Sequence, residues 1–259
     1  MSAARGVRNV AASIRQRLLD LTRAKNGNFQ DCLDRYAVER LIYRLSLSDA
    51  RERFLLKGAL LFTVWFDVPH RSTRDADSIR VVEIREQSNY SGLRVTLRAK
   101  LDNARCHLQL DVGFGDAVTP APVEIEYPTL LDDLPRPRLR VYPRETVFAE
   151  KLEAMQVLGM ANTRMKDYFD LLVLAREGAM DPKALSDAIR ATFRRRGTAL
   201  PEGLPLGLSD EFAADAAKRR QWDAFVRRNG LQAPSLSDVT GELGGFVKGL
   251  LVSTRSSGR

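Results

Sequence analysis

Two acidic residues stand two positions apart in the segment RSTRDADSIR, residues 71–80. Because side chains alternate along a strand, the carboxylates of Asp75 and Asp77 would project from the same face. Like charges held this close repel each other unless a cation lies between them. Mg²⁺ fits such a place because it prefers oxygen ligands and can join carboxylates to substrate phosphates. The spacing therefore indicates a candidate magnesium site, with an acidic surface strand as the alternative.

Two further features favour chemistry on phosphates. In LLKGALLF, Gly58 is expected at a strand-to-helix turn whose backbone N–H groups are able to bind a phosphate. In HLQLDVGFGD, alternation places Asp111 on the polar face of a strand, as a possible third carboxylate. A glycine turn and three strand acids together describe a two-metal site for phosphoryl transfer. The alternative is an ordinary turn and an exposed polar residue.

A lysine interrupts an apolar helical stripe in TVFAEKLEAM. Lys151 either extends to the edge of the core or points into a polar cavity, where it would supply a cation for a triphosphate. In the next helix, Asp167 and Asp170 are three residues apart and share one face, beside leucines. Carboxylates next to an apolar face need a partner, and Lys151 is the expected one. Lys166 is spaced to form a surface pair with Asp170.

The composition favours a polyanionic partner. The 259 residues include 41 Lys plus Arg and 33 Asp plus Glu, a net charge of +8. This balance is typical of proteins that bind nucleic acid or nucleotide phosphates. The alternative is a basic soluble protein whose charged faces are only solvated, since it has the same net charge. Two cysteines are too few for a disulfide framework. No apolar run approaches the roughly 18 residues of a membrane span, so we expect a soluble, cytoplasmic protein.

The periodicity predicts an α+β fold. Helices are expected within the first 50 residues and over 53–66, followed by strands at 74–77, 79–84, 92–101, 106–114 and 123–127. Further helices are expected from residue 143 onward, with a Pro- and Gly-rich loop or hinge at 197–207. We therefore predict two domains, residues 1–142 with the N-terminal helices and the sheet, and residues 143–259 with helices alone.

Several of these segments, taken together, resemble one protein family. FLLKGALLF, HRSTRDAD, LQLDVGFGD, YPTLL, YPRETVFAEKLEAM and RMKDYFDLLVLAR closely resemble the AbiEii/AbiGii-type nucleotidyltransferase toxins, and the similarity covers nearly the whole chain. The resemblance implies a polymerase-β-like nucleotidyltransferase core with a mixed sheet, joined to a helical domain. It also implies the toxin half of a bacterial toxin–antitoxin or abortive-infection system. Relatives transfer a nucleotide from an NTP, in some cases to the 3′ end of tRNA.

The resemblance assigns roles to individual residues. Asp75 and Asp77 match the metal carboxylates for Mg²⁺, with Asp111 as a possible third ligand. Lys57 and Gly58 match the glycine turn that holds the triphosphate, and Lys151 matches the family lysine. Lys166, Asp167 and Asp170 match the last motif, where either aspartate would position Lys151 or activate the attacking hydroxyl. Arg74 and Lys166 are basic candidates for contacting the nucleotide.

The chain departs from the family pattern at two places. Ala59 follows Gly58 where relatives usually carry glycine or serine, and Ser78 follows Asp77 where relatives usually carry a longer segment. A catalytically impaired relative that binds RNA or a cognate antitoxin is therefore the main alternative to an active enzyme, and transfer to a protein side chain is a third. Six basic residues are candidates for an RNA-binding surface or for solvated helix faces, namely Arg194, Arg195, Arg196, Lys218, Arg219 and Arg220.

Overall fold

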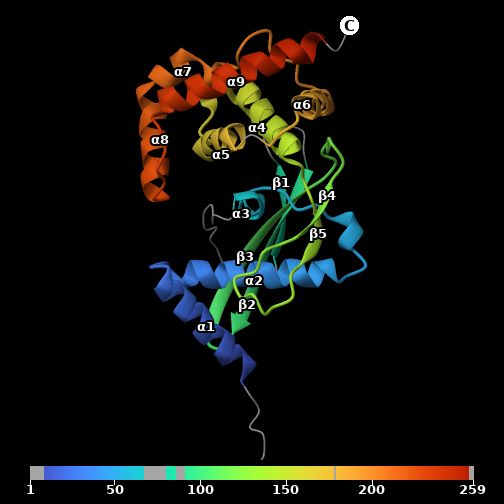
Figure 1. Ribbon diagram of the computed structural model, residues 1–259, viewed down its shortest axis with the longest axis vertical. Helices are drawn as coiled ribbons and strands as arrows, with labels where there is room; N and C mark the ends of the chain where they lie inside the picture. The colour runs from blue at the N-terminus through green and yellow to red at the C-terminus, as the bar shows by residue number, and fades with distance from the viewer. Residues whose placement is uncertain (1–8, 67–79, 86–90, 178, 257–259) are drawn as a thin grey trace, which may run out of the picture. The chain divides into compact units, whose positions relative to one another are not determined.

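The computed structural model describes residues 9–66, 80–85, 91–177 and 179–256, without the side chains of 80–85, 91 and 252–256. These residues form two compact units (Figure 1). The first contains the chain up to residue 115 and residues 124–140. The second contains residues 116–123 and the chain from residue 141 onward. The α+β class predicted from the sequence is confirmed.

The first unit begins with two helices, α1 (Val10–Ala24) and α2 (Phe29–Ser46). Each starts at an asparagine whose side chain accepts backbone N–H groups of the first turn, Asn9 for α1 and Asn28 for α2. Leu33, Tyr36 and Ala37 on α2 are buried in the core cluster of this unit. The apolar helical spacing in this segment therefore predicted both the helix and its buried face.

The main sheet of the first unit contains β1 (Arg80–Arg85), β2 (Ser91–Leu101) and β3 (Ala104–Gly113), in that order. Both pairings are antiparallel, so these three strands do not form the mixed sheet that the resemblance implied. The two-residue turn at Asp102 explains the pairing of β2 with β3, since strands joined so tightly can pair only antiparallel. Cys106 and Leu108 on β3 are buried against α1 and α2.

The rest of the first unit consists of short elements. These are the 3₁₀ turn η1 (Arg51–Arg53), α3 (Leu60–Phe66) and a two-stranded sheet of β4 (Val123–Glu126) and β5 (Arg138–Val141). Leu56 donates its N–H to the carbonyl of Arg140, and Gly58 then turns the chain into α3 with φ of 84°. The expected turn at Gly58 is confirmed, whereas β5 was not predicted. The expected strand at 74–77 lies outside the described residues.

The described part of the second unit is helical apart from its loops. Its elements in chain order are α4 (Arg144–Leu158), η2 (Gly159–Ala161), α5 (Met165–Arg176), α6 (Pro182–Arg196), η3 (Leu206–Leu208), α7 (Asp210–Ala214), α8 (Ala216–Arg228) and α9 (Leu236–Ser256). The expected helices are confirmed, and residues 197–205 form the expected loop after α6. Asp215 caps α8 and separates it from α7.

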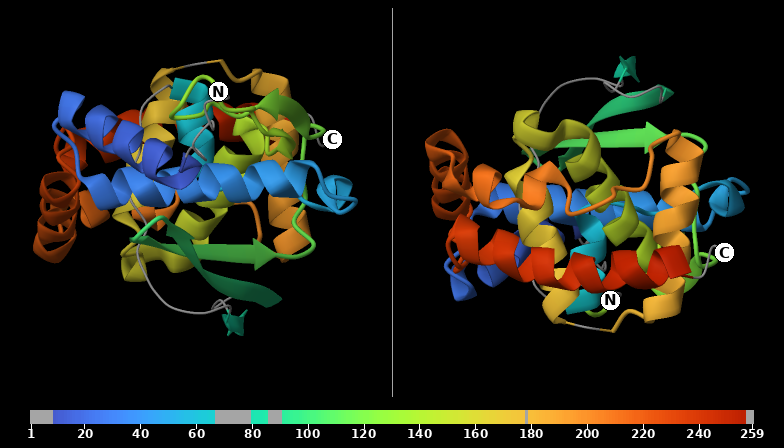
Figure 2. Two further views of the ribbon diagram at one scale, coloured as in Figure 1. Left: turned by 90° about the horizontal axis from the view of Figure 1, so that it is seen from below. Right: turned by 90° about the horizontal axis from the view of Figure 1, so that it is seen from above.

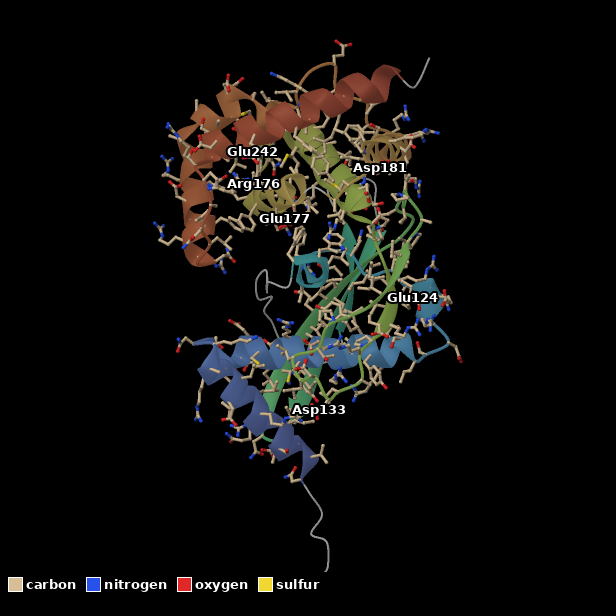
Figure 3. All side chains as sticks on the ribbon, in the orientation of Figure 1. Glu124, Asp133, Arg176, Glu177, Asp181 and Glu242 are labelled. Atoms are coloured by element: carbon tan, nitrogen blue, oxygen red, sulfur yellow. The ribbon has the colours of Figure 1, made fainter. Side chains whose placement is uncertain are left out.

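Helix α4 lies between α5 and α6, and α9 packs across α5 and α6 (Figure 2). Val147, Phe148, Leu152 and Met155 of α4 are almost fully buried, so the apolar stripe read from the sequence is the core face of this helix. At the edge, Arg176 of α5 donates two hydrogen bonds to Glu242 of α9, at 2.8 and 2.7 Å (Figure 3). The core of the second unit therefore surrounds α4.

Among the helices of the described residues, none combines the length and the apolar character that a membrane crossing needs.

Replacing Gly58 with alanine tests the turn before α3. A Cβ at this position meets no atom within 4 Å, but φ of 84° is strained for any L side chain. We therefore expect the free energy of unfolding to fall by about 1–2 kcal/mol, as measured by urea denaturation. Gly203→Ala is the control, since Gly203 has equally open surroundings and no positive φ. Equal changes in the two variants would contradict the backbone argument.

Candidate active site

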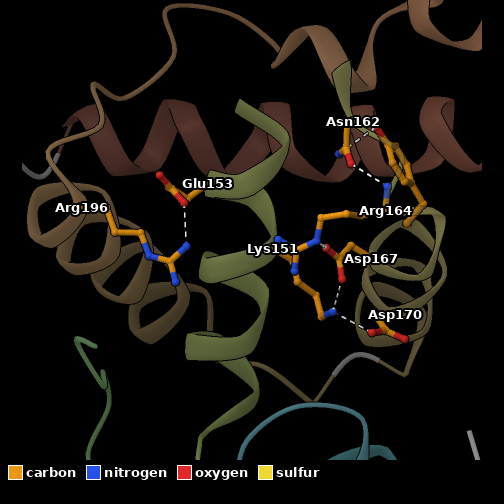
Figure 4. Close-up of polar contacts among 8 residues, drawn as sticks. Lys151, Glu153, Asn162, Arg164, Asp167, Asp170 and Arg196 are labelled. Carbon is orange, nitrogen blue, oxygen red and sulfur yellow. Dashed lines mark hydrogen bonds and ion pairs between the residues drawn. The ribbon is translucent and has the colours of Figure 1, made fainter. Parts of the chain in front are cut away.

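Lys151 on α4 and two aspartates on α5 form a buried ion cluster in the second unit (Figure 4). The Lys151 Nζ donates to Asp167 Oδ1 at 2.6 Å and to Asp170 Oδ2 at 2.7 Å. The side chains of Lys151, Asp167 and Asp170 are 14%, 1% and 4% exposed. Charge-assisted hydrogen bonds this short are among the stronger polar contacts in proteins. The cluster therefore links α4 to α5 through contacts that are buried in the interface between the two helices.

Helical geometry explains why these groups meet. Asp167 and Asp170 are one turn apart and project from the same side of α5, toward α4. The α4–α5 connection is short, so the two helices lie side by side. The predicted partnership of Lys151 with both aspartates is confirmed. Lys151 does not extend to solvent, because two carboxylates retain its ammonium group inside.

Arg164 adds a second cation to the cluster. Its Nε lies 2.7 Å from Asp167 Oδ2, and its side chain is 43% exposed. The contact is an ion pair without hydrogen-bond geometry, since Asp167 Oδ2 accepts no hydrogen bond within the described structure. Two cations thus balance two carboxylates. Sequence reasoning missed Arg164, although its spacing of three residues from Asp167 was a visible signal.

The surroundings of Lys151 keep it charged. Burial alone would lower the pKa of Lys151, but attraction to Asp170 and Asp167, with their hydrogen bonds, outweighs this effect and raises the pKa above its ordinary value of 10.5. The ammonium form therefore persists throughout the physiological range. Lys151 is a fixed positive charge rather than a proton acceptor.

The start of α5 is held in place by a buried asparagine. Lys218 Nζ of α8 donates to the carbonyl of Asn162 at 2.9 Å, and the Asn162 side chain accepts the N–H of Arg164 at 2.9 Å. Asn162 is fully buried. These contacts fix the backbone from which Arg164 and Asp167 extend. The expectation that Lys218 belongs to an RNA-binding surface is wrong, because its ammonium is buried against this carbonyl.

A second ion cluster lies on the opposite side of α4. Arg196, at the end of α6, donates to Glu153 Oε2 at 2.7 Å, and Thr198 donates to the other oxygen at 2.6 Å (Figure 4). Arg196 is only 18% exposed and also lies near Asp116 and Glu150. It is therefore a packing residue, and its expected place in an RNA-binding surface is also wrong.

The remaining residues of the predicted site do not belong to the described ion cluster around Lys151. Lys57 is half-buried, and Gly58 accepts the N–H of Leu61 at 3.1 Å at the start of α3. Lys166 is half-buried on α5. Arg74, Asp75 and Asp77 lie outside the described residues. The cluster of Lys151, Asp167 and Asp170 is therefore the part of the predicted site that the structure brings together.

The predicted third metal carboxylate has a different partner here. Asp111 on β3 accepts two hydrogen bonds from Arg94 on β2, at 2.8 and 2.9 Å, and the two residues are cross-strand neighbours. Among the described residues, no three His, Cys, Asp or Glu side chains lie together in a group able to hold a metal ion. The predicted Mg²⁺ site therefore depends on Asp75 and Asp77.

Comparison with models of known protein families shows to which family the chain belongs. The model of the nucleotidyl transferase AbiEii toxin family, type IV toxin–antitoxin system, matches residues 78–240, which is more than half of the chain. The chain belongs to this family. The AbiEii match contains Lys151, Asp167 and Asp170, and it begins one residue after Asp77. The resemblance seen in the sequence is thus confirmed. No curated protein matches the chain.

Removing the lysine tests the cluster. Lys151→Met leaves two buried carboxylates facing each other, so we expect the free energy of unfolding to fall by about 3–5 kcal/mol in urea denaturation. Lys183→Met is the matched control, because Lys183 pairs with Asp187 on the surface with its side chain 87% exposed. We expect this control to change stability by about 0.5 kcal/mol or less.

A triple variant separates charge from packing in the same measurement. Lys151→Met with Asp167→Asn and Asp170→Asn removes every uncompensated charge that the single substitution creates, so part of the lost stability should return. A single variant as stable as the Lys183 control would contradict the buried cluster.

Proposed function

We propose that this protein is a Mg²⁺-dependent nucleotidyltransferase toxin that transfers a nucleotide from an NTP to an RNA acceptor, with the 3′ end of tRNA as the preferred site. Membership of a nucleotidyltransferase toxin family supports the reaction class. The observation that carries the proposal is the contact of the Lys151 ammonium group with two buried carboxylates inside the matched region. A cognate antitoxin and a cytoplasmic site of action follow from the toxin–antitoxin role.

In this reaction an acceptor hydroxyl oxygen bonds to the α-phosphorus, and the bond from that phosphorus to pyrophosphate breaks. The hydroxyl proton leaves to solvent or to a basic group. No covalent intermediate with the protein is needed, since positioning and charge neutralisation supply most of the catalysis in phosphoryl transfer. A group that is already charged and fixed is suited to this task because it needs no reorganisation.

Within this proposal Lys151 stabilises the negative charge that develops on the leaving pyrophosphate. Asp167 and Asp170 position Lys151, since both carboxylates contact its ammonium in the structure. This arrangement favours a positioning role over activation of the attacking hydroxyl. Arg164, which is more exposed than Lys151, continues the positive charge toward solvent.

The remaining residues complete the proposal. Asp75 and Asp77, with Asp111 once it leaves Arg94, would hold the metal, which neutralises phosphate charge when bound. Lys57, Gly58, Arg74 and Lys166 would contact the nucleotide phosphates. We further propose a polymerase-β-like core within a domain of residues 1–142, and a helical domain of residues 143–259.

One observation favours a second candidate function. Ser78 follows Asp77 where relatives usually carry a longer segment. The family match begins at residue 78, after both of the predicted metal carboxylates. This favours a catalytically impaired relative that binds RNA or a cognate antitoxin. Such a protein would bind RNA without transferring a nucleotide to it, and calorimetry would show no Mg²⁺-dependent heat with any NTP.

Label transfer separates the two functions. The purified full chain is incubated with Mg²⁺, total tRNA and each of the four labelled NTPs in turn. We expect label on RNA with at least one NTP, and a rate about 10²–10³-fold lower for Asp77→Asn and Asp170→Asn. Asp187→Asn is the control, since Asp187 pairs with Lys183 and Arg190 on α6 and has no part in the cluster.

Two treatments of the product identify the acceptor. Nuclease should release the label and protease should not, whereas the reverse would show transfer to a protein side chain. The absence of label with wild-type protein and all four NTPs would contradict an active enzyme. Urea denaturation of Asp170→Asn shows whether a lost rate reflects lost folding.

A further inference from the structure

We propose that the exposed side of α8 binds the phosphodiester backbone of the RNA acceptor. This inference rests on the proposed function for the identity of the acceptor. The surface is defined by four exposed arginines of one helix, Arg219, Arg220, Arg227 and Arg228, which we call the α8 arginine face. Only two of them belong to the basic set that the sequence indicated.

Helical spacing gathers these side chains on the outer side of α8. Lys218 and Trp222 are buried on the inner side, where the Trp222 Nε1 donates to the carbonyl of Pro234 at 2.9 Å. Arg220 and Arg227 are seven residues, or about two turns, apart and point away from that buried side. Their Cα atoms are separated by about 10 Å along the helix axis. Arg219 and Arg228 flank this row.

Among the described residues, the four arginines have no acidic partner. In the part of the chain that the structure describes, none of them forms an ion pair, and the side chain of Arg219 donates to the carbonyl of Ala214. By contrast, Arg176 of α5 pairs with Glu242 and Arg190 of α6 pairs with Asp187. The helix dipole favours cations only in the last turn, which explains Arg227 and Arg228 but not Arg220. The side chain of Arg220 is therefore available to contact an external anion.

The chemistry of the α8 arginine face fits phosphates better than base edges. Arginine presents a planar fork of donors that matches phosphate oxygens. Ala224 is exposed between Arg220 and Arg227. Ala216 and Ala217 are exposed at the start of the helix. Such small side chains let a backbone approach closely. Trp222 is buried, so it does not offer a ring on which a base could stack. We therefore infer contact with RNA that is independent of base sequence.

The same helix carries one opposing charge, at Asp223. This residue is exposed, and its position places it beside the row formed by Arg220 and Arg227. Its carboxylate reduces the positive potential of the face. Removing that charge should strengthen binding, an effect that a misfolded variant cannot produce.

The experiment measures binding of labelled total tRNA to the full chain at several salt concentrations, without NTP. We expect Arg220→Glu with Arg227→Glu to raise Kd about tenfold or more. Loss of two phosphate contacts should also reduce the slope of log Kd against log salt by about 1.4–1.8. Asp223→Asn should lower Kd about twofold to threefold through the same electrostatic interaction.

Arg53→Glu with Arg136→Glu is the matched control, since it changes two exposed arginines of the first unit and alters the net charge equally. We expect this pair to change Kd by about twofold at most, because a change of net charge alone acts on RNA through a long-range field that salt screens. Equal weakening by both pairs would show a net-charge effect and overturn the proposal. Unchanged tRNA binding, with loss of binding to a poly-glutamate peptide, would assign the face to an acidic protein and also overturn it.

The tRNA-binding experiment and the label-transfer assay test two different proposals, and either proposal can fail without the other. If wild-type protein binds tRNA through the α8 arginine face but transfers no label, the enzyme proposal fails and this inference stands. If label transfer proceeds and the α8 pair changes neither Kd nor rate, this inference fails and the enzyme proposal stands. Unchanged urea midpoints exclude unfolding of the variants as the cause.

Discussion

One ammonium group between two buried carboxylates determines how α4 packs against α5 in the second unit. Lys151 would be costly to bury alone, and so would Asp167 and Asp170, because each charge loses its hydration. Together they compensate one another through contacts of 2.6 and 2.7 Å. This compensation constrains the packing of α4 against α5, since a shift of either helix would leave a charge unpaired in the interior.

Neighbouring contacts support the same arrangement. Arg196 and Glu153 hold the other side of α4, and Asn162 with Lys218 fixes the connection that leads into α5. A buried ion cluster is a weak source of net stability, because a well-packed apolar replacement is often as stable. Such a cluster therefore favours a role beyond folding. In a family of nucleotidyltransferases, a fixed cation is suited to the charge of a leaving pyrophosphate.

Sequence patterns predicted what short-range spacing controls. The alternation in β2 and β3, the apolar stripe of α4 and the pairing of Lys151 with both aspartates follow from the periods of strand and helix. Contacts between distant residues were not predictable in this way. Lys218 lies 56 positions from Asn162 and Arg196 lies 43 from Glu153. From the sequence, Lys218 and Arg196 were candidates for an RNA-binding surface or for solvated helix faces, because only the tertiary fold supplies the oxygens that they contact in the interior. The pairing of Asp111 with Arg94 likewise depends on the register of two strands.

The charge state of Lys151 is the most direct test of this account. In ¹⁵N-labelled full chain, the Nζ signal of Lys151 is assigned by its loss in Lys151→Arg and followed as the pH rises. The pKa of Lys151 is raised in the folded state, so its contribution to stability is complete below 10.5 and declines only as the pH passes the folded pKa. The account predicts that Nζ remains protonated beyond pH 10.5, the ordinary pKa of a lysine side chain. Deprotonation of Lys151 at or below pH 10.5 would contradict it.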